Sequence, residues 1–515
     1  LWLSLFMSAM DTTIITTALI KISSEFNALS QAAWLVTTYL LTYNCKSSAL
    51  SLLAKFSDVI GLKTTIIACN VLFIAFSMGC GVNGIILRAC QGIGGSGMYS
   101  LVFVAIMKLI TPEKMGFYSG VISSVFAIAN LLGPLLGGLI VDRTTWRWIF
   151  WINGPIVAVA GGLLFISMPG LKDGKSYRER LRGFDILGAI LSVCWPIPLL
   201  FALQEGGTRY GWDSGVIIGT LTSGLILLLL FGGYEAWITY RTHKDPVFPF
   251  RFLRNPACAL LLLSMLLLGM PFLVVIIQLP QRFQAVNFIS AERAGINLLP
   301  VTMISPVGAM IAGVVMGKKI AAEYILVMAS VITCLGVGLL SSLPVTAPFP
   351  SVTYGFEIIT GLGLGIASPP YFFLLYTSVE DKDMSTGTGA LNMFRTLGGC
   401  IAVAISTAMH NSVLEAKLPS ILDPEQITIV KESAASIRRL PPHLQKSIGE
   451  VFGESYNRQF QVMLAFCGLN ILVTLALVFV RKRMGIFGKV PVRKEENEFY
   501  KKPDNPTEEG KEVKG

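Results

Sequence analysis

Charged side chains are scarce in this chain. Aspartate, glutamate, lysine and arginine together make up 14% of the 515 residues, whereas soluble proteins carry about a quarter. Hydrophobic residues make up 53%, with a mean hydropathy of +0.65, and they gather in runs of about 20, the length with which a helix crosses ~30 Å of hydrocarbon. The runs lack the period-two alternation of a membrane β-barrel. We therefore expect an all-α polytopic membrane protein.

Motifs for metal binding, disulfide frameworks and ATP hydrolysis are also missing. The nine cysteines form no CxxC pair and lie within or beside apolar runs, as expected of small packing residues. The three histidines show no metal-ligand spacing, no G-x-x-x-x-G-K-[ST] sequence occurs, and no nucleophile–base set stands out. We expect no enzyme, no metal or cofactor, no ATP-driven pump and no nucleic-acid partner.

Fourteen apolar runs predict fourteen transmembrane helices. They lie near residues 1–20, 33–54, 65–83, 86–110, 116–140, 148–168, 185–204, 215–239, 257–279, 294–316, 322–343, 352–378, 388–409 and 460–480. One alternating set of loops holds sixteen lysines and arginines and the other holds six, which places the first set in the cytoplasm. Both termini then lie inside, in agreement with an even number of spans. Because the chain opens at Leu1 within an apolar run, we expect a cytoplasmic segment to precede it.

Two segments lie outside these spans. Residues 411–459 are expected to form a long extracytoplasmic loop of short amphipathic helices, broken at Pro441 and Pro442. Residues 482–515 are mixed in charge and poor in apolar side chains, which predicts a disordered cytoplasmic tail. The basic start of this tail is expected to hold the last helix at the anionic inner leaflet.

Several short motifs follow the predicted spans in order. Span 1 contains "MDTTIITTALIKIS" with Asp11, "AWLVTTYLLT" begins span 2, and "AKFSDVIGLK" follows span 2. Span 4 contains "ILRACQGIGGSG" with Arg88, and span 5 contains "ANLLGPLLGGLIVD". "WRWIFWINGP" leads into span 6, and "ALNMFRTLGG" begins span 13.

In these motifs the chain resembles the major facilitator superfamily, in particular its fourteen-span drug:proton antiporters, over residues 1–480. The resemblance implies the major facilitator fold, with two six-helix bundles and two inserted helices. The N-terminal bundle would take residues 1–168, the linker and inserted helices 169–256, and the C-terminal bundle 257–481. Span 5 matches the antiporter signature through Gly120, Gly133, Pro134, Gly137 and Gly138.

The loop motif after span 2 matches the family only in part. Asp58, Gly61 and Lys63 are kept, but two arginines and a glycine of the family pattern are replaced. The resemblance implies that these residues form a cytoplasmic latch that takes part in gating. The loss of cations predicts a weaker latch.

The signature in span 5 has a physical interpretation. Gly133 and Gly137 lie four residues apart, so they share a helix face and let a neighbouring backbone approach closely. Pro134 removes one backbone hydrogen bond and creates a bending point. We expect a closely packed, bendable seam between two domains that rock against each other; ordinary tight packing is the alternative. Within the family, the signature implies export over import.

Charges inside the spans predict proton coupling. An ionisable group at bilayer depth costs about 2.5–3.5 kcal/mol on insertion scales and usually marks a relay, a pathway or an internal pair. Asp11 lies mid-span, where burial favours the neutral carboxyl that a proton carrier requires. Arg88 is too basic to release its proton and would tune the cavity around the acid. A purely structural pairing of either residue is the alternative.

Candidate residues for the substrate cavity come from spans 2, 4 and 5. Tyr39, Tyr43 and Lys46 form a polar stripe on one helix face, and Gln91 and Asn130 are further candidates. Lys46 is open to three interpretations: it neutralises the acid of span 1, it binds an anionic substrate, or it impairs activity. In the second half, Glu357 and Arg395 are expected near a membrane edge, in solvated or snorkelling positions.

The expected function is proton-coupled export of hydrophobic small molecules, such as toxins or drugs, by alternating access. The chain is similar to fungal toxin and multidrug efflux carriers, which implies a monomer in the plasma membrane, with the vacuolar membrane as the alternative. Its partners would be a small-molecule substrate, protons and the lipid bilayer. Two other functions stay open: proton-coupled uptake or vacuolar transport of a siderophore or amino acid, and a non-transporting membrane receptor.

Overall fold

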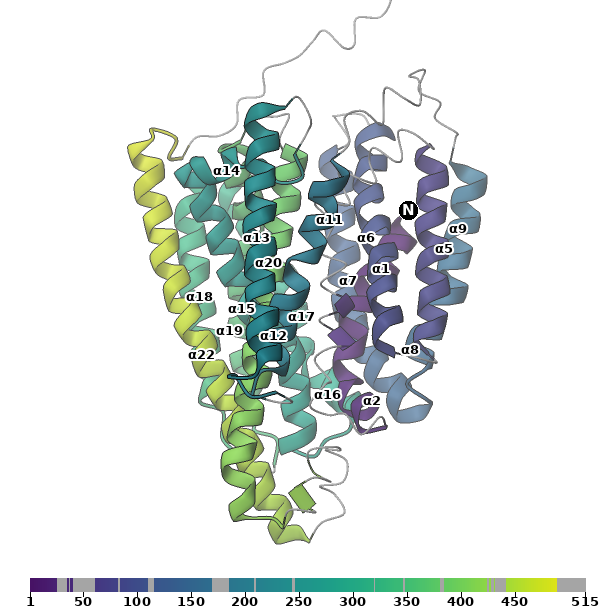
Figure 1. Ribbon diagram of the computed structural model, residues 1–515, viewed down its shortest axis with the longest axis vertical. Helices are drawn as coiled ribbons and strands as arrows, with labels where there is room; N and C mark the ends of the chain where they lie inside the picture. Colours follow the sequence, from purple (N-terminus) through teal and green to yellow (C-terminus); the bar gives the residue numbers. More distant parts are fainter. Residues whose placement is uncertain are drawn as a thin grey trace, which may run out of the picture.

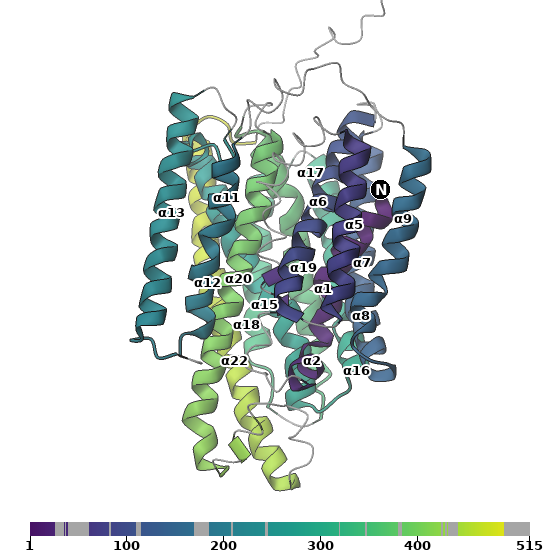
Figure 2. The same ribbon diagram turned by 45° about the vertical axis from the view of Figure 1, so that its right-hand side comes forward.

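The computed structural model is built from helices (Figures 1 and 2). It describes residues 1–25, 35–36, 38–39, 61–81, 84–109, 115–168, 185–207, 210–242, 246–318, 320–345, 348–379, 384–423, 426–427, 430 and 441–488. Within these ranges the extended pairing is limited to one isolated bridge between Gly206 and Tyr210. The helical prediction therefore agrees with the described part of the chain.

The first half of the chain supplies one group of helices, drawn at the right of Figure 1. They are α1 (Trp2–Ile14), the 3₁₀ turn η1 (Ile15–Thr17), α2 (Leu19–Glu25), α5 (Leu62–Cys80), α6 (Gly84–Leu109), α7 (Met115–Arg143), α8 (Trp148–Trp151) and α9 (Asn153–Ser167). Span 1 is thus interrupted by a 3₁₀ turn and is not one continuous α-helix. The span predicted near 33–54 lies almost entirely outside the described residues.

The second half of the chain supplies the other group. The region of the two inserted spans contains α11 (Ile186–Cys194) with α12 (Pro196–Glu205), at the place of the first, and α13 (Gly215–Arg241), at the place of the second. After them come α14 (Arg251–Arg254), α15 (Pro256–Val286), α16 (Ala291–Asn297), α17 (Leu299–Gly317), α18 (Ala322–Ser341), α19 (Val352–Tyr376), α20 (Met384–Lys417), η5 (Leu418–Ser420) and α22 (Pro442–Arg483). Contacts of α12 with α20 attach the inserted pair to the C-terminal bundle.

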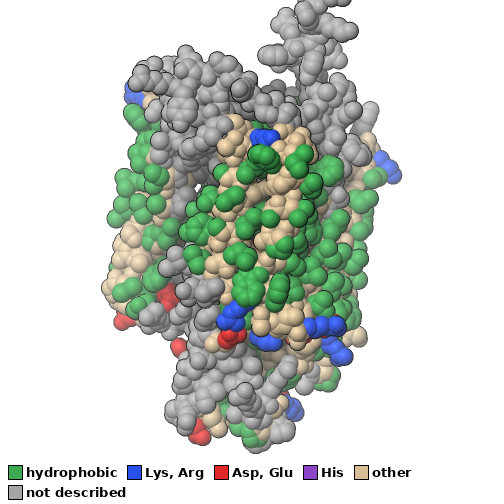
Figure 3. All heavy atoms as spheres, turned by 90° about the vertical axis from the view of Figure 1, so that its right-hand side faces the viewer, with side chains coloured by type: hydrophobic (Ala, Val, Ile, Leu, Met, Phe, Trp, Pro, Cys, Tyr) green, Lys and Arg blue, Asp and Glu red, His purple; other side chains and the backbone are tan. Residues whose placement is uncertain are grey.

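The outer surface of the helices is apolar, as lipid requires. Among the described residues, nine helices are long and apolar enough to span a membrane, and large hydrophobic side chains such as Ile166, Leu229 and Met310 are 82%, 67% and 72% exposed. Figure 3 shows hydrophobic side chains over most of the described surface on one side of the molecule, with lysines and arginines gathered toward its two ends. Helices suit this setting because their backbone groups bond within each segment.

Residues 411–459 differ from the predicted loop. The helix of span 13 continues to Lys417, and α22 begins at Pro442 and runs without interruption into span 14. The break at Pro441 and Pro442 therefore coincides with the start of a helix. Apolar side chains at helical spacing, among them Leu414 and Phe452, form a small core together with Ala285 and Val286 at the end of α15. This core lets the two helices project beyond the rest of the molecule, at the lower end of Figure 1.

Glycines set the spacing of helices in the C-terminal bundle. A Cβ on Gly363 of α19 would lie 2.5 Å from the Thr333 nitrogen of α18, and one on Gly365 would lie 2.0 Å from the Ser305 carbonyl of α17. Without a side chain at these positions, α17 and α18 both pack directly on the backbone of α19. This small-residue packing replaces the hydrophobic drive that lipid does not provide.

A buried ion pair closes one end of the same bundle, the end that the loop charges assign to the cytoplasm. Arg481, 1% exposed near the end of α22, donates from Nε to Glu323 Oε1 of α18 at 2.8 Å. Its Nη1 and Nη2 donate to the hydroxyls of Ser378 and Thr377, each at 2.7 Å. The guanidinium thus ties α22 to α18 and to the end of α19.

Removal of one partner is expected to destabilise the C-terminal bundle. Glu323→Ala leaves the Arg481 guanidinium buried without its counterion, which costs about 3–5 kcal/mol of the free energy of unfolding. Thermal unfolding of the purified protein in detergent measures this loss. Arg458→Ala, which breaks a half-exposed pair with Glu454, is the control and is expected to cost only about 0–1 kcal/mol. Equal losses in the two variants would contradict the prediction.

Candidate functional site

Asp11 lies fully buried on α1, inside the N-terminal bundle. Its Oδ2 accepts a hydrogen bond from Arg88 Nη1 at 2.5 Å. Its Oδ1 accepts from Gln91 Nε2 at 3.1 Å and from Asn153 Nδ2 at 2.9 Å. Several donors around one carboxyl are the arrangement in which an ionised group is tolerated inside a protein. The structure thus brings Asp11 and Arg88 into direct contact.

The Arg88 guanidinium is enclosed as tightly as the carboxylate. It stacks on the rings of Tyr39 and Phe150, with centroids 4.2 and 5.3 Å away, and Nη1 also donates to Gln91 Oε1 at 2.7 Å. Tyr39 is 1% exposed and donates to the Ser8 carbonyl at 3.3 Å. Tyr39 and Gln91, predicted as cavity residues, therefore pack around the ion pair.

Two polar residues complete this group and were not singled out from the sequence. Asn153 Nδ2 also donates to Ser77 Oγ at 2.8 Å, and Ser77 Oγ donates to the Phe150 carbonyl at 2.8 Å. Asn153 stood in the quoted stretch "WRWIFWINGP", where an asparagine inside an apolar run was the available signal. We call Asp11, Ser77, Arg88, Gln91 and Asn153 the Asp11 cluster; its members come from α1, α5, α6 and α9.

Gly133 and Gly137 place α7 directly against α1. A Cβ on Gly133 would lie 2.1 Å from Thr13 Oγ1, and a Cβ on Gly137 would lie 2.0 Å from the Ile14 carbonyl. Neither position admits a side chain unless the helices separate. The close approach expected from the four-residue spacing is thus present in the structure.

The turn η1, which directly follows α1, contacts Pro134 of α7. Thr17 Oγ1 donates to the Pro134 carbonyl at 3.2 Å. Thr17 belongs to the turn η1, where α1 changes to 3₁₀ geometry, a change that often marks a hinge. Since Asp11 precedes Thr13 by two residues, α1 connects the Asp11 cluster to the glycine contacts of α7.

The outer side of α7 contacts the other half of the molecule. A Cβ on Gly138 would lie 2.3 Å from the Ala291 carbonyl of α16, and a Cβ on Gly295 of α16 would lie 2.3 Å from the Pro134 carbonyl. Each helix therefore needs a glycine opposite the other's backbone. Figure 1 shows α16 at the end from which α20 and α22 project, the end that the loop charges assign to the extracytoplasmic side.

Polar contacts hold the two halves together at this end. Asp142 Oδ2 accepts from the Glu292 backbone nitrogen at 2.7 Å, and Arg143 pairs with the Glu292 carboxylate at 3.5 Å. Gln284 of α15 donates to the Thr17 carbonyl at 3.1 Å. We call this set of α1, α7, α15 and α16 contacts the extracytoplasmic seam. The seam is closed in this structure.

The remaining predicted gating and cavity residues are distributed as follows. Gly61 begins α5 with φ +101°, a conformation that favours glycine. Lys63 lies over the Phe165 ring at 4.7 Å, and Gly120 lies within α7. The described residues do not include Tyr43, Lys46 and Asp58. The backbone of Asn130 is described, but its side chain is not.

The expectation for the two ionisable residues of the second half was wrong. Glu357 is fully buried, because it faces the bundle from the first turns of α19. Gly269 lies in the middle of α15, and a Cβ at this position would be 1.7 Å from the Arg395 carbonyl. The backbone of Arg395 therefore packs against the middle of α15 and not near a membrane edge. The Arg395 guanidinium lies 5.4 Å from the Phe272 ring and within electrostatic reach of Tyr99 on α6.

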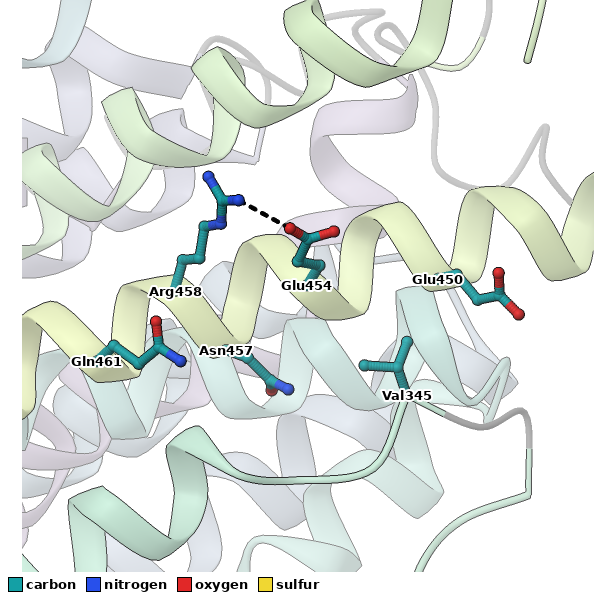
Figure 4. Close-up of a pocket in the computed structure, with 6 residues that line it drawn as sticks. All are labelled: Val345, Glu450, Glu454, Asn457, Arg458 and Gln461. Atoms are coloured by element: carbon teal, nitrogen blue, oxygen red, sulfur yellow. Dashed lines mark hydrogen bonds and ion pairs between the residues drawn. The ribbon is translucent and has the colours of Figure 1, made fainter. Parts of the chain in front are cut away.

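A separate hollow lies on the projecting part of α22 (Figure 4). Its volume is about 420 Å³, and its walls are Val345, Glu450, Glu454, Asn457, Arg458 and Gln461. Glu454 is engaged by Arg458 at 2.9 Å and by Lys417. This hollow lies on the part of α22 that projects beyond the bundles, and none of its walls belongs to the Asp11 cluster. We therefore do not assign it to the transport path.

A side chain at Gly138 is expected to open the seam. Gly138→Leu inserts atoms where the Ala291 carbonyl now lies, so α7 and α16 must separate. Disulfide crosslinking between Arg143→Cys and Glu292→Cys measures closure, and its yield is expected to fall. Gly162→Leu, at a position with open space around it, is the control and leaves the yield unchanged. A full yield in Gly138→Leu would contradict the prediction.

Known proteins share this chain's sequence and architecture. The family model described as the Major Facilitator Superfamily matches residues 1–403. An MFS-type transporter of Fusarium mangiferae is 35% identical over 494 residues, which cover 93% of this chain and 82% of that protein. A rubrofusarin-specific efflux pump of Gibberella zeae is 30% identical over 447 residues, which cover 85% of this chain and 80% of that pump.

Solved structures agree at the level of the fold. A bacterial homologue of the human lysosomal transporter Spinster superposes with a TM-score of 0.60 at 14% identity, covering 94% of this chain and 96% of that one. The family match and the relatives together make this protein a multi-pass membrane transporter and not an enzyme. The chain belongs to the Major Facilitator Superfamily.

Proposed function

We propose that this transporter exports hydrophobic, amphiphilic small molecules in exchange for protons, by alternating access. The observation that carries the proposal is the fully buried pair of Asp11 and Arg88, which α1 connects to the extracytoplasmic seam. A charged pair at this depth is costly to maintain, and such pairs usually mark relays or pathways. Because α1 connects the Asp11–Arg88 pair to the seam, a change in the protonation of Asp11 can change whether the seam is open or closed.

The coupling follows from the contacts of α1. Protonation of Asp11 removes the negative charge that faces Arg88, and a buried guanidinium without its counterion is strongly destabilised. Relief requires that α1 moves or that water enters the cluster. Because α1 packs through Thr13 and Thr17 on α7, such a movement alters the seam. The protonation state of Asp11 thereby changes the balance between the two open forms.

The relatives support the direction of transport. Several are efflux pumps of fungi, among them pumps of Gibberella zeae and Penicillium rubens, so we infer export of a toxin or other secondary metabolite. Arg395 of α20 lies over the Phe272 ring of α15 and within electrostatic reach of Tyr99 of α6, and we place the substrate beside them. We assign the protein to the plasma membrane, with the vacuolar membrane as the alternative, and expect it to act as a monomer without a cofactor.

Vesicle transport tests the proposal. The purified protein is reconstituted, a pH gradient is imposed, and a panel of fluorescent amphiphiles is followed together with the internal pH. Export predicts that an amphiphile moves against the proton flow. Movement with the protons would indicate uptake, and the absence of coupled movement for the whole panel would indicate a receptor; either result contradicts the proposal.

Asp11→Asn is expected to abolish gradient-driven flux while substrate binding stays measurable. The amide keeps the size of the side chain but cannot take up or release a proton, so flux falls to that of protein-free vesicles. Equilibrium binding of the same fluorescent amphiphile, measured in detergent, separates lost coupling from misfolding. Asp213→Asn, at an exposed aspartate before α13, is the control with unchanged flux. Gradient-driven flux at the native rate in Asp11→Asn would end the proposed role.

A further inference from the structure

Glu357 has an environment opposite to that of Asp11. It lies in the second turn of α19 and is 0% exposed, and neither carboxyl oxygen has a well-formed hydrogen bond to any described residue. The backbone N–H of Val301, in the first turn of α17, offers it only a weak, poorly aligned interaction. Thr353, one turn earlier on α19, also has a buried hydroxyl without a partner.

Neighbouring elements present no counterion to Glu357 within the part of the chain that the structure describes. On α18 the glutamate is Glu323, which pairs with Arg481 at the opposite end of the helix. From α15, Arg282 donates only through Nη2, to the carbonyls of Leu343 and Pro344, and its buried Nε and Nη1 have no hydrogen-bond partner among the described residues. No charge–charge interaction joins Arg282 to Glu357.

The other ionisable groups nearby are also engaged. Arg395 of α20 lies over the Phe272 ring, and Tyr354 of α19 donates to Asn297 at 3.0 Å. Helix α17 itself carries no charged side chain, and Lys318 follows its far end. Glu357 therefore has no described cation to stabilise an ionised form.

An isolated carboxylate in such a place is unstable. Desolvation of an unpaired charge costs several kcal/mol even after relaxation, so a buried carboxyl without a counterion takes up a proton instead. The structure with a closed seam therefore requires Glu357 to be neutral. The requirement for a neutral Glu357 applies only to the closed form, because water that reaches the carboxyl in an open form would solvate its charge.

Glu357 lies directly behind the extracytoplasmic seam. Its neighbour Val301 is in the first turn of α17, and the preceding helix α16 carries Ala291, Glu292 and Gly295, which contact α7. When α16 leaves α7, the first turn of α17 is exposed toward the extracytoplasmic side, and water gains a route to the carboxyl.

We propose that Glu357 is a second proton-binding carboxyl of the transport cycle, loaded from the extracytoplasmic side, and that the seam closes only over its protonated form. The proposal rests on the alternating-access export described above. In that cycle the outward-open protein releases its substrate, Glu357 takes up an external proton, and the seam closes for the return. The proton and the substrate thus use the same opening at different times.

The sign of the linkage is fixed by this assignment. The closed form binds one proton more than the open form, so closure is favoured at low external pH and lost as the pH rises. The ratio of closed to open protein is expected to fall by up to about tenfold per pH unit, the limit for one linked proton. The seam holds two further carboxylates: Asp142 accepts from the Glu292 backbone nitrogen, and Glu292 pairs with Arg143.

Crosslinking at the seam tests the proposal without any transport. The yield between Arg143→Cys and Glu292→Cys is measured in vesicles across a range of external pH. With Glu357 present, the yield is expected to fall as the pH rises. Glu357→Gln carries a neutral side chain of the same size, so its yield is expected to stay high throughout. Glu450→Gln, on the surface of the α22 extension, is the control and keeps the native response.

A second measurement keeps the proposal testable if Glu357→Gln folds poorly. Infrared difference spectroscopy of the native protein, between low and high external pH, should show a protonated carboxyl band that is shifted in Glu357→Asp and missing in Glu357→Gln. An unchanged pH response in Glu357→Gln, or a native yield that does not depend on pH, would overturn the proposal. Failure of Asp11→Asn to lose flux would instead overturn the export mechanism and leave the crosslinking result standing.

Discussion

Lipid offers neither hydrogen bonds nor counterions, and the structure is organised around that constraint. Apolar side chains occupy the outer surface, and the polar ones turn inward and meet one another. In the C-terminal bundle, Ser264 bonds to Tyr371 at 2.6 Å and to Asn470 at 2.7 Å, which joins three helices. The Asp11 cluster does the same in the N-terminal bundle with a full ion pair at its centre. Each bundle is thus held from within by groups that lipid cannot satisfy.

Between the bundles the contacts are of a different kind. At the extracytoplasmic seam the helices meet backbone to backbone, because Gly138 and Gly295 remove the side chains that would separate them. Packing of this type is lost over a small separation, since dispersion forces fall steeply with distance. Together with a few exposed polar contacts such as that of Arg143 with Glu292, it makes an interface that is either closed or open, as a rocking transporter needs.

Two carboxyls in contrasting environments are linked to this interface. Asp11 is surrounded by donors and a guanidinium, whereas Glu357 has no described counterion. In our proposals, the protonation of Asp11 changes the position of α1. The protonation of Glu357 depends on whether water reaches the first turn of α17. Contrasting environments are a recognised way to divide roles between like groups. A transporter with two such acids is able to bind protons at different stages of one cycle.

The amino-acid sequence by itself determined that this protein lies in a lipid bilayer and where most of its helices lie along the chain. Run length, charge scarcity and loop charges are local properties, and they predicted most of the helices that the structure describes. The spacing of Gly133 and Gly137 predicted the close approach of a neighbouring backbone. What only the tertiary structure decided is which side chains meet. Asn153 joined Asp11 across more than a hundred residues, and Glu357, expected in solvent, became fully buried. Burial depends on how helices pack around each position, and no single stretch of sequence contains that information.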